Sequence, residues 1–298
     1  MWFLGGCGPA ERVWEEHATT TPRAAGAGDR LWWSDGDGVQ VADPTDGATW
    51  GRWEGPVAAM VADRSGVWLA SGDALVRLDG AGDEVARWSD GSAPALFGAA
   101  DGAWVGWADG ALWGCRPDAC RRSPWMGPVD ALVDAGDGVV TVDADSVRRV
   151  DPTRPDVVWT VEGGGTTATL ARDTVVVAGP FDLTGLGVAD GAPRWTFPVA
   201  AVAPPVAVGG WAVVADEAGV TAIGAASGRP RWRRDAVGVR ALSAGPAWTV
   251  AAWDGVMADV IDVPSGAHAA RFRSDVPPVA LPCGWAVVEA GVAGCYRW

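Results

Sequence analysis

Tryptophan recurs at two positions of a repeat of some 36 residues, and this spacing constrains the fold more than any other feature of the sequence. The first position recurs in steps of 35 to 37 residues at Trp32, Trp68, Trp104, Val140, Val176, Trp211, Trp248 and Trp285. The second recurs in steps of 34 to 40 residues at Trp14, Trp53, Trp88, Trp125, Trp159, Trp195, Trp232 and Phe272. A fixed period in this range is typical of solenoids, propellers and arrays.

Residues 56–91 show the repeat unit most clearly, because four short runs of apolar and β-branched residues alternate there with turn residues. The runs cover residues 57–61, 67–70, 75–78 and 84–88, and glycine, aspartate and serine separate them. This pattern predicts four β-strands of 4 to 6 residues, here named A to D in chain order. Four such strands with their turns fill one repeat, which is typical of a β-propeller blade.

The two ends of the chain complement each other. The first repeated feature is a D strand at residues 12–15, and the last unit has strands A, B and C at residues 278–281, 285–289 and 292–296. The sequence therefore predicts an all-β fold, an eight-bladed β-propeller of four-stranded antiparallel blades, in which the N-terminal strand completes the last blade and closes the ring. We expect residues 11–298 to form this single domain and residues 1–10 to form an N-terminal stub and tether.

The charge of the chain argues against two classes of partner. The net charge is −14 and no lysine is present, whereas nucleic acids and anionic membrane surfaces require a basic face. Residues 195–215 carry no charge and are long enough to span a bilayer. Pro198, Pro204, Pro205 and the Gly209-Gly210 pair instead indicate a crossover between blades followed by a hairpin.

The five cysteines suggest two disulfides and one further role. Cys115 and Cys120 flank a predicted C-to-D hairpin, so we expect them to lie opposite each other and to form a disulfide. Cys283 and Cys295 lie in the last blade, before strand B and near the end of strand C, and a second disulfide is expected there. Two disulfides imply an oxidising compartment; the alternative is five free thiols, most of them buried.

Cys7 has a separate interpretation, because Leu4-Gly5-Gly6-Cys7 resembles the lipobox of bacterial lipoproteins. The resemblance implies cleavage before Cys7 and lipid attachment to it. The residues before Cys7 are fewer than a signal peptide needs, so we expect the true start to lie upstream of Met1; the alternative is that the match arises by chance. Gly8 rather than aspartate follows the cysteine, and the resemblance then implies an exported, periplasmic protein anchored in the outer membrane.

Five predicted C-to-D hairpins share a motif in which a hydrophobic residue and a turn with serine, threonine or glycine precede the aromatic residue of strand D, and four of the five also contain an aspartate. The segments are residues 41–47 before Trp50 or Trp53, 150–153 before Trp159, 187–191 before Trp195, 223–228 before Trp232 and 261–266 before Phe272. This pattern resembles the repeat of PQQ-like β-propellers over nearly the whole chain. In that family the polar residues and glycine form the turn, and the tryptophan packs against the next blade.

The resemblance implies two classes of function. The family includes quinoprotein dehydrogenases, which hold pyrroloquinoline quinone and calcium. It also includes binding proteins without a cofactor, such as the outer-membrane barrel-assembly lipoprotein. A lipobox followed by one propeller without further domains is similar to the second class.

The residues that could carry chemistry do not form a known catalytic or metal-binding pattern. Quinoprotein dehydrogenases carry two adjacent cysteines, and no Cys-Cys pair occurs here. His17 and His268 are far apart in sequence, and no zinc spacing is present. Asp143 and Asp145 suggest calcium without the spacing of a known loop, and Ser243 lies in a near match to a nucleophile elbow outside the required context. We therefore expect no catalytic, cofactor-binding or metal-binding residues.

As a whole the sequence predicts a non-catalytic scaffold at the bacterial cell envelope. It is expected to be monomeric by itself, to present its loops to protein partners, to contact the membrane only through a lipid anchor, and to need no cofactor. The alternative is an exported enzyme or a quinoprotein-like propeller that binds a small ligand or metal in its central funnel. Aspartate, arginine and exposed indole converging on the funnel mouth would favour the alternative, and a broad exposed apolar or charged rim would favour the scaffold.

Overall fold

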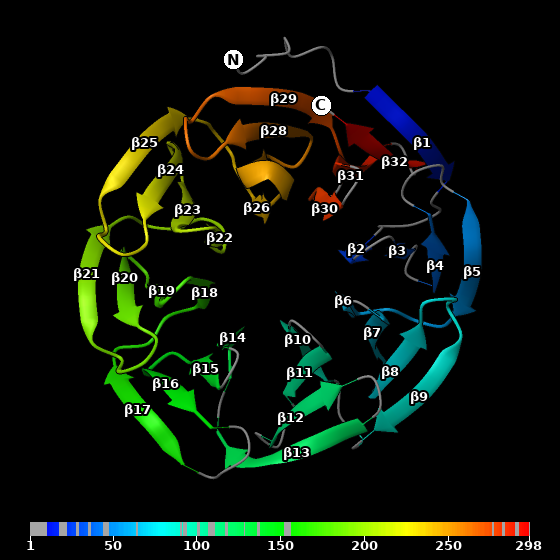
Figure 1. Cartoon of the computed structure of the whole chain (residues 1–298), viewed down its shortest axis with the longest axis horizontal. Helices are drawn as coiled ribbons and strands as arrows, with labels where there is room; N and C mark the ends of the chain where they lie inside the picture. The colour runs from blue at the N-terminus through cyan, green and yellow to red at the C-terminus, as the bar shows by residue number, and fades with distance from the viewer. Residues whose placement is uncertain are drawn as a thin grey trace, which may run out of the picture.

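A computed structural model gives the conformation of most of the chain. It describes residues 11–17, 23–27, 30–34, 37–43, 48–63, 65–89, 91, 94–99, 102–106, 111–116, 119–127, 129–135, 138–151, 156–275, 277–281, 284–289 and 292–297. These residues form 32 β-strands and one short 3-10 helix, η1 (Pro246–Trp248). Figure 1 shows the strands arranged as a ring of sheets around a common centre, which is the β-propeller fold.

Seven of the sheets are each formed by four consecutive strands. Blade 1 contains β2 (Arg23–Ala27), β3 (Arg30–Ser34), β4 (Gly38–Ala42) and β5 (Thr49–Glu54). Blade 2 contains β6 (Ala59–Asp63), β7 (Gly66–Ser71), β8 (Ala74–Asp79) and β9 (Glu84–Ser89). Blade 3 contains β10 (Ala95–Ala99), β11 (Gly102–Gly106), β12 (Ala111–Arg116) and β13 (Ala119–Met126). Blade 4 contains β14 (Ala131–Asp134), β15 (Val139–Val142), β16 (Ser146–Val150) and β17 (Val157–Glu162).

The next three sheets follow the same plan. Blade 5 contains β18 (Thr167–Ala171), β19 (Thr174–Ala178), β20 (Asp182–Gly187) and β21 (Pro193–Pro198). Blade 6 contains β22 (Val206–Val208), β23 (Trp211–Asp216), β24 (Gly219–Gly224) and β25 (Pro230–Asp235). Blade 7 contains β26 (Ala241–Ala244), β27 (Thr249–Trp253), β28 (Met257–Asp262) and β29 (His268–Arg273). Each sheet runs from strand A nearest the centre to strand D on the outside (Figure 1).

The eighth four-stranded sheet, blade 8, combines both ends of the chain. It contains β30 (Val279–Leu281), β31 (Gly284–Glu289), β32 (Val292–Arg297) and β1 (Glu11–His17). Strand β1 pairs antiparallel with β32, so that Glu11 lies opposite Arg297 and His17 opposite Val292. Figure 1 shows the two terminal strands side by side. The incomplete first and last repeats therefore meet, and the C-terminal strand has no open edge.

Burial explains the composition of the strands. All residues of β7, β15 and β19 are buried, because neighbouring sheets cover both faces of these strands. The three strands are accordingly rich in valine, alanine and leucine. The outer strands β9, β17, β21 and β25 alternate between exposed and partly buried residues. Their partly buried positions include Trp88, Trp159, Trp195 and Trp232.

Apolar side chains fill the space between neighbouring blades. Trp32 and Trp53 of blade 1 pack with Val67 and Leu69 of blade 2, and similar clusters join blades 4 and 5, blades 5 and 6, and blades 6 and 7. Indole rings therefore pack between neighbouring sheets at these sites, as the resemblance to PQQ-like propellers implied.

Two details of the predicted blades are wrong. Strand lengths vary more than expected, since β13 has 8 residues and β22 and β30 have 3 each. Trp248 does not lie on a B strand, because it ends η1 in the turn before β27 and its side chain is 49% exposed. The additional residues of this A-to-B turn move the indole from the sheet to the loop.

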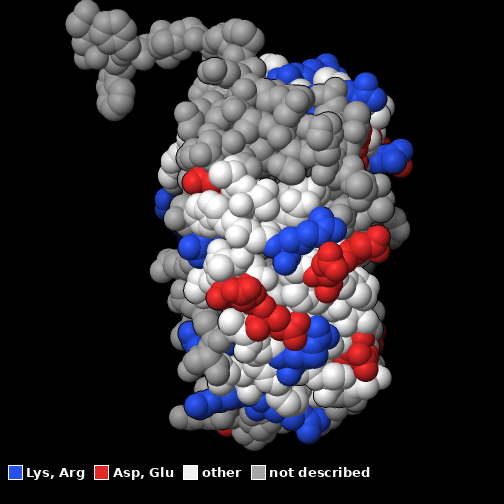
Figure 2. Space-filling view, turned by 90° about the vertical axis from the view of Figure 1, so that its right-hand side faces the viewer, with Lys and Arg blue, Asp and Glu red and all other residues white. Residues whose placement is uncertain are grey.

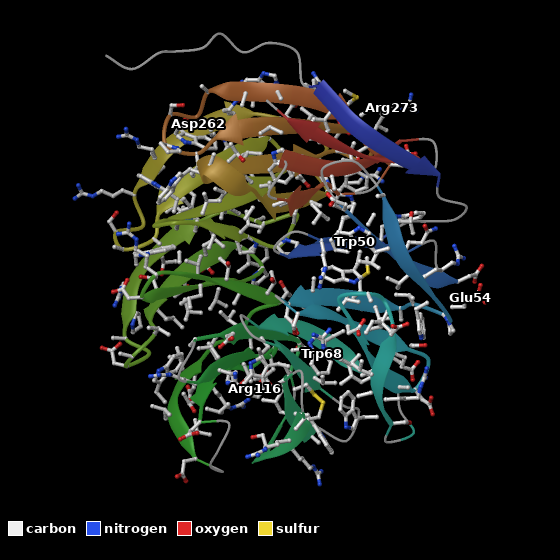
Figure 3. The ribbon with its side chains drawn as sticks, turned by 45° about the vertical axis from the view of Figure 1, so that its right-hand side comes forward. Trp50, Glu54, Trp68, Arg116, Asp262 and Arg273 are labelled. Atoms are coloured by element: carbon white, nitrogen blue, oxygen red, sulfur yellow. A yellow bond between two sulfur atoms is a disulfide. The ribbon has the colours of Figure 1, made fainter. Side chains whose placement is uncertain are left out.

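The turns of the propeller lie on two faces. Because the strands alternate in direction, the A-to-B and C-to-D turns share one face, here called the AB/CD face, and the remaining connections share the BC/DA face. Figure 3 shows Asp262, which begins the C-to-D turn of blade 7, and Arg273, which ends its D strand, at opposite ends of that blade. Within the described residues, no helix has the length and apolar character that crossing a membrane requires.

Candidate binding surface

Three residues at the C-to-D turns of blades 5 to 7 tie neighbouring blades together. Each accepts, at its backbone carbonyl, a hydrogen bond from the indole N–H of the preceding blade's D strand. The pairs are Trp159 to Val188 (3.1 Å), Trp195 to Ala225 (2.6 Å) and Trp232 to Val263 (2.6 Å). Each of these tryptophans therefore fixes the C-to-D turn of the next blade.

The same three residues also hold the A-to-B turns, which lie nearest to the centre of the ring. Their backbone N–H groups donate to the carbonyl of the last residue of each A-to-B turn. The pairs are Val188 to Asp173 (3.0 Å), Ala225 to Gly210 (3.0 Å) and Val263 to Trp248 (2.9 Å). Two successive hydrogen bonds thus connect each of these inner turns to a tryptophan of the preceding blade.

Two large side chains flank the A-to-B turn of blade 6. Arg172, from the corresponding turn of blade 5, lies against Gly210, and the ring of Trp248, from blade 7, lies against Gly209. A β-carbon built on Gly210 would be 3.2 Å from Nε of Arg172, and one built on Gly209 would be 1.8 Å from Cζ3 of Trp248. Only a turn without side chains leaves room for the indole here. We call Arg172, Gly209, Gly210 and Trp248 the inner rim.

The backbone at both ends of the inner rim is strained. The φ angles are 59° at Arg172, 51° at Ala247 and 63° at Trp248, and these are the only non-glycine residues with positive φ in the described part of the chain. A left-handed conformation costs an L-residue about 1 kcal/mol. Strain of this kind clusters at functional sites, which makes the inner rim a candidate binding site.

The BC/DA face of the same three blades carries exposed apolar side chains. Phe181 is 79% exposed and Val237 is 84% exposed, while Val202 and Val256 are 43% and 50% exposed. Phe181 and Val256 belong to the B-to-C turns of blades 5 and 7, and Val202 and Val237 to the connections that lead into blades 6 and 7. We call these four residues the apolar loops. Single exposed apolar residues are ordinary, but four of them on one loop face of consecutive blades make this face a candidate interaction surface.

The ion pair between Asp63 and Arg77 is buried in blade 2 and is structural. Oδ2 of Asp63 accepts a hydrogen bond of 2.7 Å from Nε1 of Trp68, and the guanidinium carbon of Arg77 lies 4.9 Å from the centroid of that indole. Figure 3 shows Trp68 in the interior of the ring of blades. Because both charged side chains are almost fully buried, they are closed to ligands.

The aspartates that suggested calcium do not form a metal site. The carboxylate of Asp143 accepts hydrogen bonds from the backbone N–H groups of Asp145 and Ser146 and pairs with Arg148. Burial by itself would raise the pKa of Asp143, but these partners lower it. In the described part of the chain, no three His, Cys, Asp or Glu side chains gather where they could hold a metal ion.

The structure joins one of the two predicted cysteine pairs. Cys115 and Cys120 face each other across β12 and β13, with Cα atoms 4.0 Å apart and an S–S bond of 2.07 Å, drawn in yellow in Figure 3. Cys295 lies on β32 opposite Ala286. Cys283 and Cys7 lie outside the described residues, so the second disulfide and the lipid attachment stay predictions.

Ser243 and His268 are not brought together. Ser243 lies on β26, the innermost strand of blade 7, and His268 lies on β29, the outermost strand of the same sheet. Nε2 of His268 instead lies 3.3 Å from Oδ1 of Asp259. The two residues therefore do not form a nucleophile and its base.

Sequence reasoning missed both the inner rim and the apolar loops. It assigned Trp248 to a strand and did not single out Arg172 or Phe181. The signals that could have identified the rim were the Gly209-Gly210 pair and the extra residues around Pro246, which lengthen one A-to-B turn relative to the others.

Comparison with known proteins identifies the fold. No family model and no curated protein matches the sequence. The structure of BamB from Moraxella catarrhalis is similar with a TM-score of 0.75 at 13% identity, covering 97% of this chain and 100% of that chain. The computationally designed protein Ika8 is similar with a TM-score of 0.77 at 15% identity, covering 96% and 99%. The WD40 domain of Pan2 from Neurospora crassa is similar with a TM-score of 0.58 at 8% identity, covering 98% and 96%. At these identities the similarity shows the β-propeller fold alone.

Proposed function

We propose that this protein is a PQQ-like β-propeller without a cofactor that acts as a protein-interaction scaffold at the bacterial cell envelope. The observation that carries the proposal is the presence of the apolar loops on one face of three consecutive blades. Phe181 and Val237 are almost fully exposed, and covering apolar area of this kind contributes about 25 cal/mol per Å². Similarity in fold to BamB and to a WD40 domain supports the proposal.

Charge supports a protein partner over other partners. The net charge of −14 disfavours polyanions such as nucleic acids and anionic lipid surfaces. Figure 2 shows arginine side chains interspersed with aspartate and glutamate on the side formed by the outer strands near β5 and β9. Mixed charge of this kind keeps the outer wall soluble and leaves the loop faces for recognition.

Two observations on the cysteines support the proposed envelope location. The disulfide between Cys115 and Cys120 is typical of proteins that fold outside the cytosol. The lipobox-like sequence that ends at Cys7 supports an anchored protein. Intact mass of the protein isolated from its native membrane tests this part: we expect cleavage before Cys7 and an added acyl mass on it, and an unmodified Cys7 would contradict the anchor.

Site-specific photo-crosslinking tests the scaffold function. A photoreactive residue at position 181 or 237 is expected to form one defined adduct with an envelope protein in intact cells. The same residue at position 85 or 158 is the control, because Val85 and Val158 are exposed by 54% and 53% but lie on outer strands. Double substitution of Phe181 and Val237 by serine is expected to abolish capture through a third position, Val202. Equal adducts at the control positions, or none at 181 and 237, would overturn the proposal.

A further inference from the structure

We infer that the inner rim binds a short acidic peptide segment of a partner protein, in which a glutamate or aspartate stands beside an aromatic or large apolar residue. The inference rests on the proposed scaffold function in assuming a protein ligand, but it concerns other residues on the opposite face. Substitution of the apolar loops leaves the rim intact, so the two proposals can fail separately.

The positive charge of Arg172 is available to a ligand. The side chain is exposed, and it makes no ion pair or hydrogen bond within the described residues. Its neighbour Asp173 is already paired with Nη1 of Arg194 at 2.9 Å, so that carboxylate does not neutralise Arg172. An unpaired arginine beside an open turn is a site for a planar carboxylate, which a guanidinium binds through two parallel hydrogen bonds.

Trp248 supplies an apolar surface next to this charge. Its ring rests on Gly209, yet 49% of the side chain is exposed. Its backbone carbonyl is held by the N–H of Val263, so the indole projects from a fixed turn. Tryptophan and arginine are the residue types most enriched among the strong contacts of protein interfaces. Here Trp248 and Arg172 contact Gly209 and Gly210, two consecutive residues of one turn.

The strained backbone indicates that the two side chains are held in place at a cost in stability. Twelve glycines in the described part of the chain adopt positive φ without this cost, whereas Arg172 and Trp248 adopt it with large side chains. Glycine at either position would relieve the strain and remove the side chain. A preorganised side chain loses little freedom when a ligand binds, which strengthens binding.

The chemistry of the expected ligand follows from the charge of Arg172, the exposed indole of Trp248 and the glycine turn between them. The carboxylate pairs with Arg172, the neighbouring apolar side chain packs on the indole, and the peptide backbone passes over Gly209 and Gly210, where no side chain obstructs it. The net charge of −14 opposes long polyanions, so the segment carries one or two carboxylates rather than a run of them. The rim is an open edge of exposed side chains, which suits an extended peptide better than an enclosed small molecule.

Fluorescence anisotropy with capped, dye-labelled decapeptides tests the inference on the full chain. The panel contains one peptide with Glu-Phe at its centre, one with Gln-Phe, one with Glu-Ala and one with Phe-Glu. We expect the Glu-Phe or Phe-Glu peptide to bind the native protein at least tenfold more tightly than the Gln-Phe and Glu-Ala peptides. The Arg172→Gln variant should lose the preference for glutamate over glutamine, and Trp248→Ala the preference for phenylalanine over alanine. The control Arg229→Gln, an exposed arginine on the same face, should bind as the native protein does.

The Arg172→Gly variant separates a binding role from a structural one. Because glycine relieves the left-handed strain, this variant is expected to melt at the same temperature as the native protein or higher while losing affinity for the peptide at least tenfold. A lower melting temperature together with unchanged affinity would assign Arg172 to packing on Gly210 and overturn the inference. The inference would also be overturned if none of the four peptides bound, or if the glutamate and glutamine peptides bound equally well. N-acetylphenylalanine is a further control, and binding as tight as that of the peptides would overturn the inference too.

Discussion

Arg77 donates a hydrogen bond of 2.9 Å from Nη2 to Oδ1 of Asp63, and the two side chains are only 2% and 1% exposed. Asp63 ends the innermost strand of blade 2 and Arg77 lies on its third strand, with the buried Trp68 between them on the second. The three side chains together connect three of the four strands of one sheet. Its contribution is visible only when one partner is removed, since desolvation offsets much of the attraction between buried charges.

We predict that Asp63→Asn lowers the free energy of unfolding by about 3 kcal/mol, because Arg77 is left buried without a counter-charge. The double variant Asp63→Leu/Arg77→Met should recover most of the loss, since no uncompensated charge remains. Urea unfolding of the native protein and both variants measures this. Arg194→Met is the matched control, because its pair with Asp173 is exposed and its loss should change stability little. A double variant no more stable than Asp63→Asn would contradict the prediction.

The stability of the protein is predicted to fall in acid. Burial by itself would raise the pKa of Asp63, but hydrogen bonds from Ser65 and Trp68 and the charge of Arg77 outweigh it and lower the pKa below the usual 3.8. The unfolded chain then binds a proton more readily than the folded one, so this stabilisation is complete above the unfolded pKa and is lost as the pH falls through the folded pKa.

Other aspartates at the turns also have lowered pKa values and contribute to the loss of stability in acid. The pKa values of Asp143, Asp216 and Asp254 are also lowered, with burial opposing the shift and hydrogen bonds producing it. Urea midpoints are therefore expected to be constant from neutral pH to pH of about 5 and to decrease below pH of about 4. Asp63→Asn should show a weaker decrease than the native protein. An equal or steeper decrease in that variant would exclude Asp63 as a contributor.

Two glycines with nearly equal φ separate strain from steric overlap. Gly228 has φ of 67° and a β-carbon there would lie 2.6 Å from Cγ of Trp195, whereas Gly72 has φ of 62° with nothing within 4 Å. We predict that Gly72→Ala costs about 1 kcal/mol from the left-handed backbone alone, and that Gly228→Ala costs about 3 kcal/mol because the tryptophan must also move. Thermal unfolding of the two variants measures the difference. An equal loss of stability in the two variants would show that the side chain of Trp195 moves aside at no cost in free energy.

The disulfide between Cys115 and Cys120 closes a short loop, with a sequence separation of 5. A loop of this size restricts the unfolded chain only modestly, so the Cys115→Ser/Cys120→Ser variant is expected to lose about 2 kcal/mol of stability. Reductant should lower the stability of the native protein by a similar amount and leave the variant unchanged. A response of the variant to reductant would reveal a further disulfide, such as the predicted pair of Cys283 and Cys295.

Much of the strand layout could be predicted from the sequence, because it depends on local signals that recur. Turn residues separate the strands, and the aromatic residue of the outer strand marks the boundary with the next blade, as Trp195 and Trp232 do. The pairing of β1 with β32 could be predicted because the missing strands at one end match those present at the other.

The candidate sites could not be predicted in the same way. Trp248 matches the period of the buried tryptophans, yet a lengthened turn moves it into solvent, and spacing alone does not distinguish the two outcomes. The conformation of Arg172 gives no sequence signal, because arginine rarely adopts positive φ. Phe181 resembles an ordinary apolar residue at the end of a strand in the sequence, and only the folded structure shows that its side chain is exposed.

The seam between β1 and β32 has a consequence for biosynthesis. Strand β1 is synthesised before β32, its partner in the sheet, so it carries an unsatisfied strand edge while the blades between them assemble. Sealing of the ring is then the slowest event expected in folding, since it brings together the residues farthest apart in the chain. It also places Glu11 opposite Arg297, so a chain circularly permuted to begin in a loop between two other blades is expected to form the same ring.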